Sequence, residues 1–150
     1  MAHGYGIFLH ENGNKYEGAW VDDLMQGEGF ETWVDGSSYQ GFYKAGLKHG
    51  TGCYKWADGS VYTGEWFENK IGGKGVYEWT DGRRYAGDWN ENNMEGQGVY
   101  TWADGRQYDG AYLKDKKHGY GIYYWADGRK YEGQWKEGKQ HGDGLYFTKG

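Results

Sequence analysis

The side chains of this 150-residue chain that could do chemistry are histidines and aspartates that recur at fixed intervals. Histidine is a common zinc ligand, and paired aspartates can act as acid and base catalysts. The recurring histidines are separated by multiples of 23 residues, or at least ~10 Å in a sheet of side-by-side units, whereas zinc holds its ligand nitrogens at ~2.1 Å. They cannot share one metal ion, and we interpret them as loop residues: His3, His49, His118 and His141.

The recurring aspartates have a structural explanation as well. Each one precedes a glycine, at positions 35, 58, 81, 104 and 127, and Asp-Gly is a turn sequence. The recurrent Gly-x-Gly never extends to the G-x-G-x-x-G of a dinucleotide loop, and the chain has no Walker sequence and no nucleophile elbow. We therefore expect no enzymatic activity, no catalytic residue, no metal site and no cofactor.

A strict 23-residue repeat positions all of these residues. Each copy begins with Gly-x-Gly, without insertion or deletion along the chain, which indicates a repeat array. Six copies are complete and a seventh is partial: 4–26, 27–49, 50–72, 73–95, 96–118, 119–141 and 142–150. We interpret residues 1–3 as a remainder outside the array, and the chain as a piece of a longer array or of a multidomain protein.

Each copy has the pattern of two strands joined by a tight turn. Its aromatic residues and glycines fall two apart on both sides of the Asp-Gly pair, which is strand periodicity. A two-residue loop would place the rings of the two strands on opposite faces, whereas a three-residue loop such as 57–59 gathers them on one face. We choose the three-residue loop. The other face should be the wetter one, and an alanine at Gly64 or Gly87 should meet a neighbouring ring.

The expected fold is therefore all-β: an elongated, single-layer, twisted antiparallel meander of stacked 23-residue hairpins. A single layer has no second sheet to bury it, so its 30 aromatic residues must supply the packing, with 30 glycines as room for the rings. The lone Cys53 allows no intrachain disulfide, and the chain has neither a secretory signal nor an apolar run that could span a bilayer. A net charge of −5 disfavours binding to nucleic acid.

Three runs of the chain resemble MORN (membrane occupation and recognition nexus) repeats: YKWADGSVYTGEW (54–66), YEWTDGRRYAGDW (77–89) and YYWADGRKYEGQW (123–135). His-Gly-x-Gly stands between copies at 49–52, 118–121 and 141–144, and the resemblance covers residues 4–150. It implies a right-handed twisted sheet with an aromatic-lined groove, in scaffolds, at membrane contacts, or beside kinase or methyltransferase domains. The first two copies depart from the pattern at His10, Asn12 and Glu31.

The first functional hypothesis is a non-catalytic scaffold that binds a helical or extended protein segment in this groove. Aromatic rings make strong contacts with partners because they lose little side-chain entropy. The candidate groove residues are Tyr39, Trp56, Tyr62, Trp66, Trp79, Tyr85, Trp89, Trp102, Tyr108, Tyr112, Trp125, Tyr131 and Trp135.

Two other functions stay open. The array could bind anionic phospholipid headgroups, since residues 96–150 are net basic, or it could hold a neighbouring kinase-type or cytoskeletal domain in place. We also expect a homodimer through terminal strands with unpaired edges, and a cytoplasmic location, with a membrane or cytoskeletal junction as the more specific place. The candidate lipid-binding residues are Lys114, Lys116, Lys117, Arg129, Lys130, Lys136 and Lys139.

Overall fold

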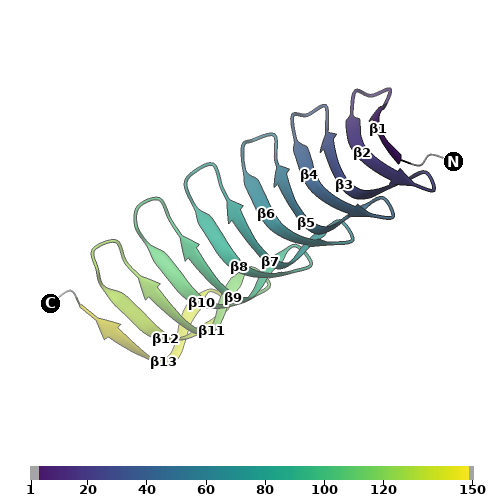
Figure 1. Ribbon diagram of the computed structural model, residues 1–150. Coiled ribbons are helices and arrows are strands. Elements are labelled where there is room, and N and C mark those ends of the chain that lie inside the picture. Colours follow the sequence, from purple (N-terminus) through teal and green to yellow (C-terminus); the bar gives the residue numbers. More distant parts are fainter. Residues whose placement is uncertain (1–3, 149–150) are drawn as a thin grey trace.

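The computed structural model describes residues 4–148 as one open antiparallel sheet of 13 strands, and this part of the chain contains no helix. Each strand pairs only with its neighbours in sequence, so the first and last strands lie at opposite ends (Figure 1). The expected remainder at 1–3, with His3, falls outside the described residues. The strands are β1 (Gly4–Leu9), β2 (Lys15–Val21), β3 (Leu24–Thr32), β4 (Ser38–Lys44), β5 (Leu47–Lys55), β6 (Val61–Phe67), β7 (Lys70–Glu78), β8 (Arg84–Asn90), β9 (Asn93–Thr101), β10 (Gln107–Leu113), β11 (Lys116–Tyr124), β12 (Lys130–Lys136) and β13 (Lys139–Phe147).

The Asp-Gly turns are three-residue loops, as predicted. Between β5 and β6, the Trp56 N–H donates to the Ser60 carbonyl oxygen at 2.9 Å, and the Gly59 N–H donates to the Trp56 oxygen at 3.0 Å. Gly59 has φ +100°, a left-handed conformation that glycine adopts at low cost. Asp58 accepts the Ser60 N–H at 2.8 Å, which fixes the loop. Tyr54 consequently lies opposite Tyr62, and the rings of both strands share one face.

A second set of turns closes the opposite edge of the sheet. Between β6 and β7, Glu68 and Asn69 both have positive φ, 44° and 71°, which is the pattern of a two-residue type I′ turn. The register then shifts between Gly64 and Trp66, and Gly73 opposite has φ +86°, so a bulge follows the turn. The sequence pattern does not reveal this turn, because its residue types vary from copy to copy.

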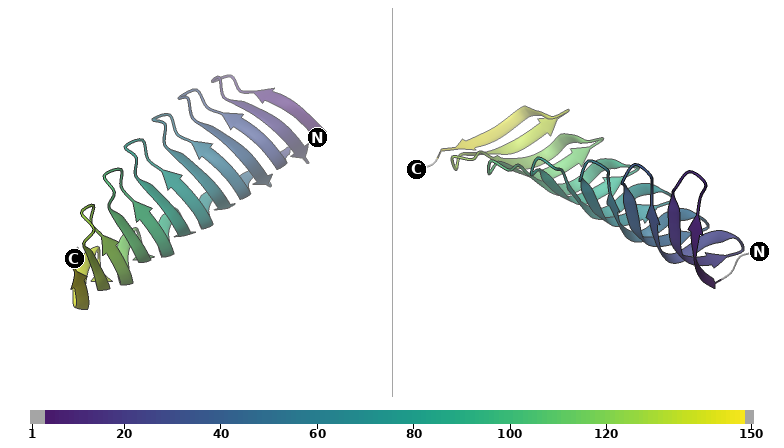
Figure 2. Two further views of the ribbon diagram at one scale, coloured as in Figure 1. Left: turned by 60° about the vertical axis from the view of Figure 1, so that its left-hand side comes forward. Right: turned by 90° about the horizontal axis from the view of Figure 1, so that it is seen from above.

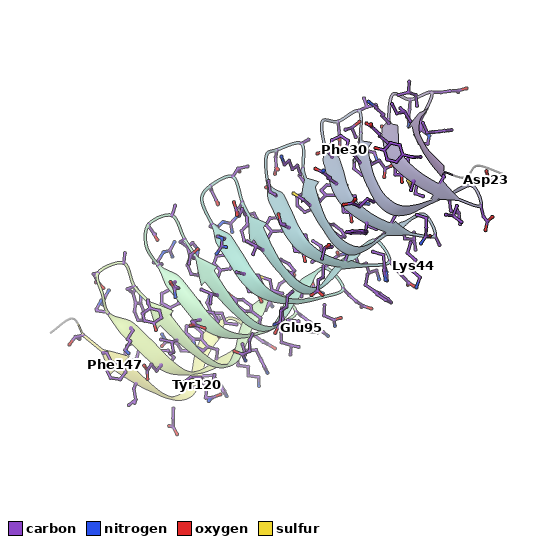
Figure 3. All side chains as sticks on the ribbon, viewed as in Figure 1. Asp23, Phe30, Lys44, Glu95, Tyr120 and Phe147 are labelled. Atoms are coloured by element: carbon purple, nitrogen blue, oxygen red, sulfur yellow. The ribbon has the colours of Figure 1, made fainter. Side chains whose placement is uncertain are left out.

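The sheet is a single layer throughout, and it twists from one end to the other (Figure 2). Its core lies on one face, which we call the ring face. The opposite face is wetter, as expected, with Phe30 and Tyr120 among its exposed residues (Figure 3). No helix within residues 4–148 could cross a membrane. The buried core residues are Tyr16, Tyr39, Tyr43, Tyr62, Trp66, Ile71, Tyr85, Trp89, Tyr100, Tyr108, Tyr112, Tyr131 and Trp135.

Candidate binding face

A row of buried rings forms the base of the ring face, and we call it the inner ring row. Tyr62 is fully buried, and its ring lies over the glycine pair Gly64 and Gly75 of β6 and β7. Its hydroxyl donates to the main-chain oxygen of Glu65 at 2.9 Å. Glycine is required on both strands, because a Cβ on Gly75 would overlap the ring and a Cβ on Gly64 would overlap the backbone of β7. The same bond to the residue three positions on is made by Tyr16, Tyr39, Tyr85, Tyr108 and Tyr131.

Edge-to-face contacts join these tyrosines into a continuous row. Tyr62 lies between Trp66, at 5.4 Å and 89°, and Trp89, at 5.6 Å and 86°. The T-shaped arrangement places the positive edge of one ring against the negative face of the next. The Trp66 indole N–H also donates to the Gly52 oxygen at 3.1 Å, so the buried polar atom has a partner. Burial raises the pKa of Tyr16 to about 12, and it also raises the pKa of Tyr39, Tyr62, Tyr85 and Tyr108.

A second row is mostly half-buried, apart from the buried Tyr100 and the exposed Tyr146, and we call it the outer ring row. It alternates the tryptophan that begins each Asp-Gly loop with the tyrosine at the fifth place of the next copy. The centroids of Trp56 and Tyr77 are 5.0 Å apart, those of Tyr77 and Trp79 are 4.4 Å apart, and the contacts continue from copy to copy. The row contains Trp33, Tyr54, Trp56, Tyr77, Trp79, Tyr100, Trp102, Tyr123, Trp125 and Tyr146.

The structure divides the candidate groove residues between the two rows. Trp56, Trp79, Trp102 and Trp125 lie in the outer ring row, where a partner could reach them. The other nine belong to the inner ring row and are at most 7% exposed, so they support the face from below: Tyr39, Tyr62, Trp66, Tyr85, Trp89, Tyr108, Tyr112, Tyr131 and Trp135. The candidate set lacks the fifth-place tyrosines of the outer ring row, although their 23-residue spacing is visible in the sequence: Tyr54, Tyr77, Tyr100, Tyr123 and Tyr146.

The position two residues before the first glycine of the next copy also contributes to the ring face, because its side chain lies between the two rows. Met25, Ile71 and Met94 occupy it in three copies and pack against the buried rings. Lys48 and Lys117 occupy the same place in two others, each with its ammonium near four rings. Burial lowers the pKa of both lysines, because desolvation disfavours the charged form.

Arginines line the loop edge of the last three complete copies. The Arg83 guanidinium carbon lies 4.9 Å from the centroid of the Trp79 ring, and its Nε is 2.8 Å from the Asp81 carboxylate. The pKa of the Asp81 carboxyl is lowered because it accepts the Arg83 main-chain N–H and lies beside the guanidinium. Arg106 and Arg129 repeat both contacts with Trp102, Asp104, Trp125 and Asp127. Each of these arginines therefore forms an ion pair with the aspartate of its own loop.

The candidate lipid-binding residues do not form one cluster. Lys114, Lys116 and Lys136 line one hollow of about 360 Å³ together with Leu113, His118 and Glu137. Lys117 lies among the rings instead, and Arg129 is paired with Asp127. The Lys130 ammonium is 2.9 Å from Glu132, and Lys139 is exposed on β13.

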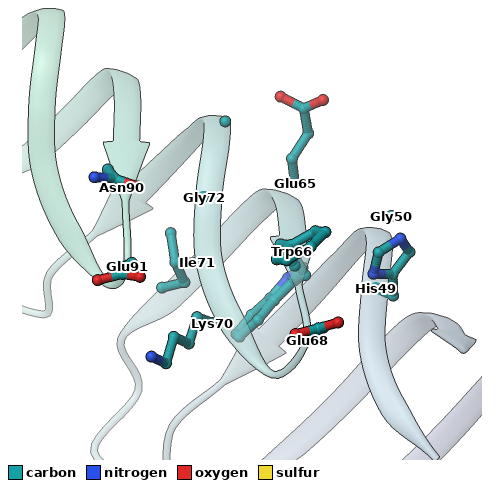
Figure 4. A pocket seen from close by; sticks show the side chains of 12 residues that line it. His49, Gly50, Glu65, Trp66, Glu68, Lys70, Ile71, Gly72, Asn90 and Glu91 are labelled. Atoms are coloured by element: carbon teal, nitrogen blue, oxygen red, sulfur yellow. The ribbon is translucent and has the colours of Figure 1, made fainter. Parts of the chain in front are cut away.

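A hollow of about 630 Å³ lies beside the two-residue turns of β6–β7 and β8–β9 (Figure 4). It exists where Gly72 stands in place of the larger side chain that five other copies carry, since nothing lies within 4 Å of a Cβ built there. Glu65, Glu68, Lys70 and Glu91 line it, together with His49. Within residues 4–148, His49 Nδ1 is buried without a hydrogen-bond partner, and no group of three His, Cys, Asp or Glu side chains could hold a metal ion.

Comparison with known proteins gives a family and a similar fold. A family model for the MORN repeat matches residues 1–15, 16–38, 39–61, 62–83, 85–105, 108–128 and 131–150. No curated protein sequence matched the chain. Among solved structures, the chain is similar to the SAS-4 (dCPAP) TCP domain of Drosophila melanogaster in complex with a proline-rich motif of Ana2 (dSTIL). The TM-score is 0.55 at 13% identity, over 97% of this chain and 85% of that chain, a likeness of fold alone.

Proposed function

Because the chain belongs to the MORN repeat family, a non-catalytic repeat module, we propose that it is a protein-interaction scaffold whose outer ring row binds an extended segment of a partner protein. The observation that carries this proposal is the outer ring row itself. Its tryptophans are partly exposed in successive copies, as are the tyrosines between them except Tyr100, and buried rings support the row from below. Tryptophan and tyrosine are the residues that most often dominate binding energy at protein interfaces.

The spacing of the copies favours an extended partner over a helical one. Two strands at about 4.8 Å each give about 9.6 Å per copy. A polyproline II segment rises about 3.1 Å per residue and completes a turn in three residues, or about 9.3 Å. Every third residue of such a segment could therefore meet successive copies in the same way. An α-helix, with a pitch of about 5.4 Å, has no whole number of turns per copy.

The fold similarity supports the same mode of binding. The SAS-4 TCP domain, whose fold matches nearly the whole of this chain, was solved in complex with a proline-rich motif. Proline-rich segments are pre-organised and dock on aromatic surfaces in several unrelated domains. An extended segment that lies along the outer ring row is therefore the mode we propose, and a helical segment is the alternative.

Isothermal titration with a 15-residue proline-rich peptide tests the proposal. Trp79→His should weaken binding about tenfold, because it removes an indole from the row while keeping a residue that the first copy carries at the same place, His10. Tyr120→Ser, at a side chain 54% exposed on the opposite face, is the matched control and should leave binding unchanged. Equal losses in both variants, or tighter binding of an amphipathic helical peptide, would contradict the extended mode.

A second candidate function, binding of an anionic phospholipid headgroup, has one observation in its favour. Three lysines, Lys114, Lys116 and Lys136, line one hollow, and each adds about 1 kcal/mol near an anionic surface. Co-sedimentation with phosphatidylinositol bisphosphate vesicles, against phosphatidylcholine vesicles, tests it. Lys116→Ala with Lys136→Ala should reduce binding, whereas Lys44→Ala at another exposed turn should not. Equal binding to both vesicles would exclude this function.

Pairing of the terminal strands between two copies of the chain also stays a prediction. β1 and β13 each have one strand neighbour, so each presents one open edge in this sheet. Sedimentation equilibrium across a range of protein concentrations tests it, since a monomer at all concentrations would contradict it. The cytoplasmic location stays a prediction as well.

A further inference from the structure

Two lysines of the ring face sit in equivalent boxes of four rings. The Lys48 ammonium lies 5.3–5.9 Å from the centroids of Trp33, Tyr39, Tyr54 and Trp66. The Lys117 ammonium lies 5.5–5.7 Å from those of Trp102, Tyr108, Tyr123 and Trp135, the residues 69 positions further on. The two boxes are built from the same places of the repeat, three copies apart.

The boxes differ in their charged neighbour. Lys48 has Glu31, whose charge favours the ammonium form and whose carboxylate accepts the Tyr43 hydroxyl at 2.7 Å. Glu31 stands at the fifth place of its copy, and the residue at that place beside Lys117 is Tyr100. The charge acting on Lys117 is the like charge of Arg106, which is itself paired with Asp104 at 2.8 Å. Within residues 4–148, Lys117 makes no ion pair.

A half-buried ammonium needs an acceptor that rings do not supply. Cation–π contacts attract the charge, but the three N–H donors of an ammonium are satisfied only by hydrogen-bond acceptors. In the Lys48 box the charge of Glu31 already favours the ammonium form without a direct ion pair, so a carboxylate is the ligand chemistry that suits such a site. Arg106, stacked 4.9 Å from the Trp102 ring, adds a second cation beside the Lys117 box.

We propose that the Lys117 box receives an aspartate or glutamate side chain of the bound partner segment, which fixes the register of that segment on the array. This inference rests on the proposed function, because the outer ring row includes two walls of the box, Trp102 and Tyr123. A partner segment with one acidic residue would bind with that residue at the Lys117 box, in the fifth copy (96–118), and so in a single register. The rings alone are similar in every copy and would not distinguish one register from another.

The test compares two 15-residue proline-rich peptides that differ only by glutamate or glutamine at the centre. The wild-type chain should bind the glutamate peptide about tenfold more tightly. Lys117→Met should remove this preference and leave the affinity for the glutamine peptide unchanged, because methionine fills the same place at Met25 and Met94. Lys48→Met is the matched control and should keep the preference. A preference that survives Lys117→Met would overturn the inference.

A gain-of-function variant tests the same preference at the other box, and a small probe makes the result independent of the peptides. Glu31→Tyr removes the internal carboxylate from the Lys48 box, so in the Lys117→Met background it should restore the preference for glutamate. Sodium glutarate, against neutral glutaramide, should shift the indole N–H NMR signal of Trp102 in the wild type but not in Lys117→Met. Peptides that bind without discrimination would overturn the carboxylate site and leave the scaffold proposal standing. A shift of the Trp102 signal by glutarate in a chain that binds neither peptide would support the carboxylate site and count against the scaffold proposal.

Discussion

The ring of Tyr85 lies across Gly98 of the neighbouring strand, in the space that a Cβ on Gly98 would need. The tyrosine hydroxyl donates to the main-chain oxygen of Asp88, on its own strand, at 2.9 Å. In a sheet with a single layer, this contact replaces the packing that a second layer would give. The stability of the array should therefore depend on the glycines under the rings as strongly as on the rings.

Gly98→Ala should lower the free energy of unfolding by about 3 kcal/mol, because the new Cβ would overlap the ring of Tyr85, which is fully buried and cannot move away easily. Gly6→Ala is the control, since Gly6 holds the same place in the first copy and nothing lies within 4 Å of its Cβ position. It should change the stability by less than about 1 kcal/mol. Urea unfolding measures both, and similar effects in the two variants would contradict the ring-over-glycine account.

At Gly87 the sequence-based expectation of a ring clash is incomplete. A Cβ there would meet the Tyr85 hydroxyl at 2.9 Å, but it would first meet the backbone of Gln97 and Gly98. The glycine pairs thus serve two purposes, since they let two strands approach closely and they leave room for the ring.

Tyr85→Phe should cost about 1–2 kcal/mol of unfolding free energy, because it keeps the ring and removes the donor to Asp88. Tyr5→Phe, at a side chain 75% exposed, is the control and should be nearly neutral. The two midpoints in thermal unfolding measure the difference. If both variants melted together, the buried hydroxyl would have no role in stability.

The tyrosines also predict loss of stability in alkali. Burial raises the pKa of Tyr16 to about 12 and raises that of Tyr62 and Tyr85 as well. These phenols hold their protons in the folded state at a pH where the unfolded chain has lost them. Their contribution is therefore complete below about pH 10 and is lost as the pH rises above this value. Lys48 and Lys117 act with the opposite sign, because burial lowers their pKa.

Thermal unfolding measured from about pH 8 upward, with tyrosinate absorbance on the same samples, checks this prediction. The midpoint should fall above about pH 10, and the buried tyrosines should ionise together with unfolding. Ionisation of all tyrosines near pH 10 with the circular dichroism of the sheet unchanged would contradict it.

Ala45→Asn should stabilise the chain by about 0.5–1 kcal/mol, because Ala45 has φ +49° and asparagine tolerates the left-handed conformation better than alanine does. Ala57→Asn is the control, at a loop position that is not among the left-handed residues. It should have little effect. A destabilised Ala45→Asn in chemical unfolding would show that the turn is limited by something other than its backbone.

Much of this fold was predictable from the positions that carry the same residue type in successive copies. The Asp-Gly pairs fixed the three-residue loops, and the spacing of the rings then placed them on one face. The two-residue turns were not predictable in this way, because their residue types change from copy to copy. Their second position is nevertheless always a residue that tolerates a left-handed backbone: Asp23, Gly46, Asn69, Asn92, Asp115 and Gly138.

The division into two rows also lay beyond the sequence pattern. Tyr54 and Tyr62 face each other in neighbouring strands and look equivalent in the repeat, yet only Tyr62 is fully buried. The difference arises because Tyr62 lies over a glycine pair and between two further rings. The box around Lys117 combines residues from three strands, β10, β11 and β12, with Trp102 from the loop after β9, so it could be found only from their arrangement in space.

The pairing of each strand with only its sequence neighbours has a mechanical consequence. Tension applied to the two termini has no distant strand pair to break first, so the array should come apart from its ends, one hairpin after another, at similar low forces. A chain built in this way can act as an extensible tether that lengthens in equal steps and reforms each step locally when the load is released.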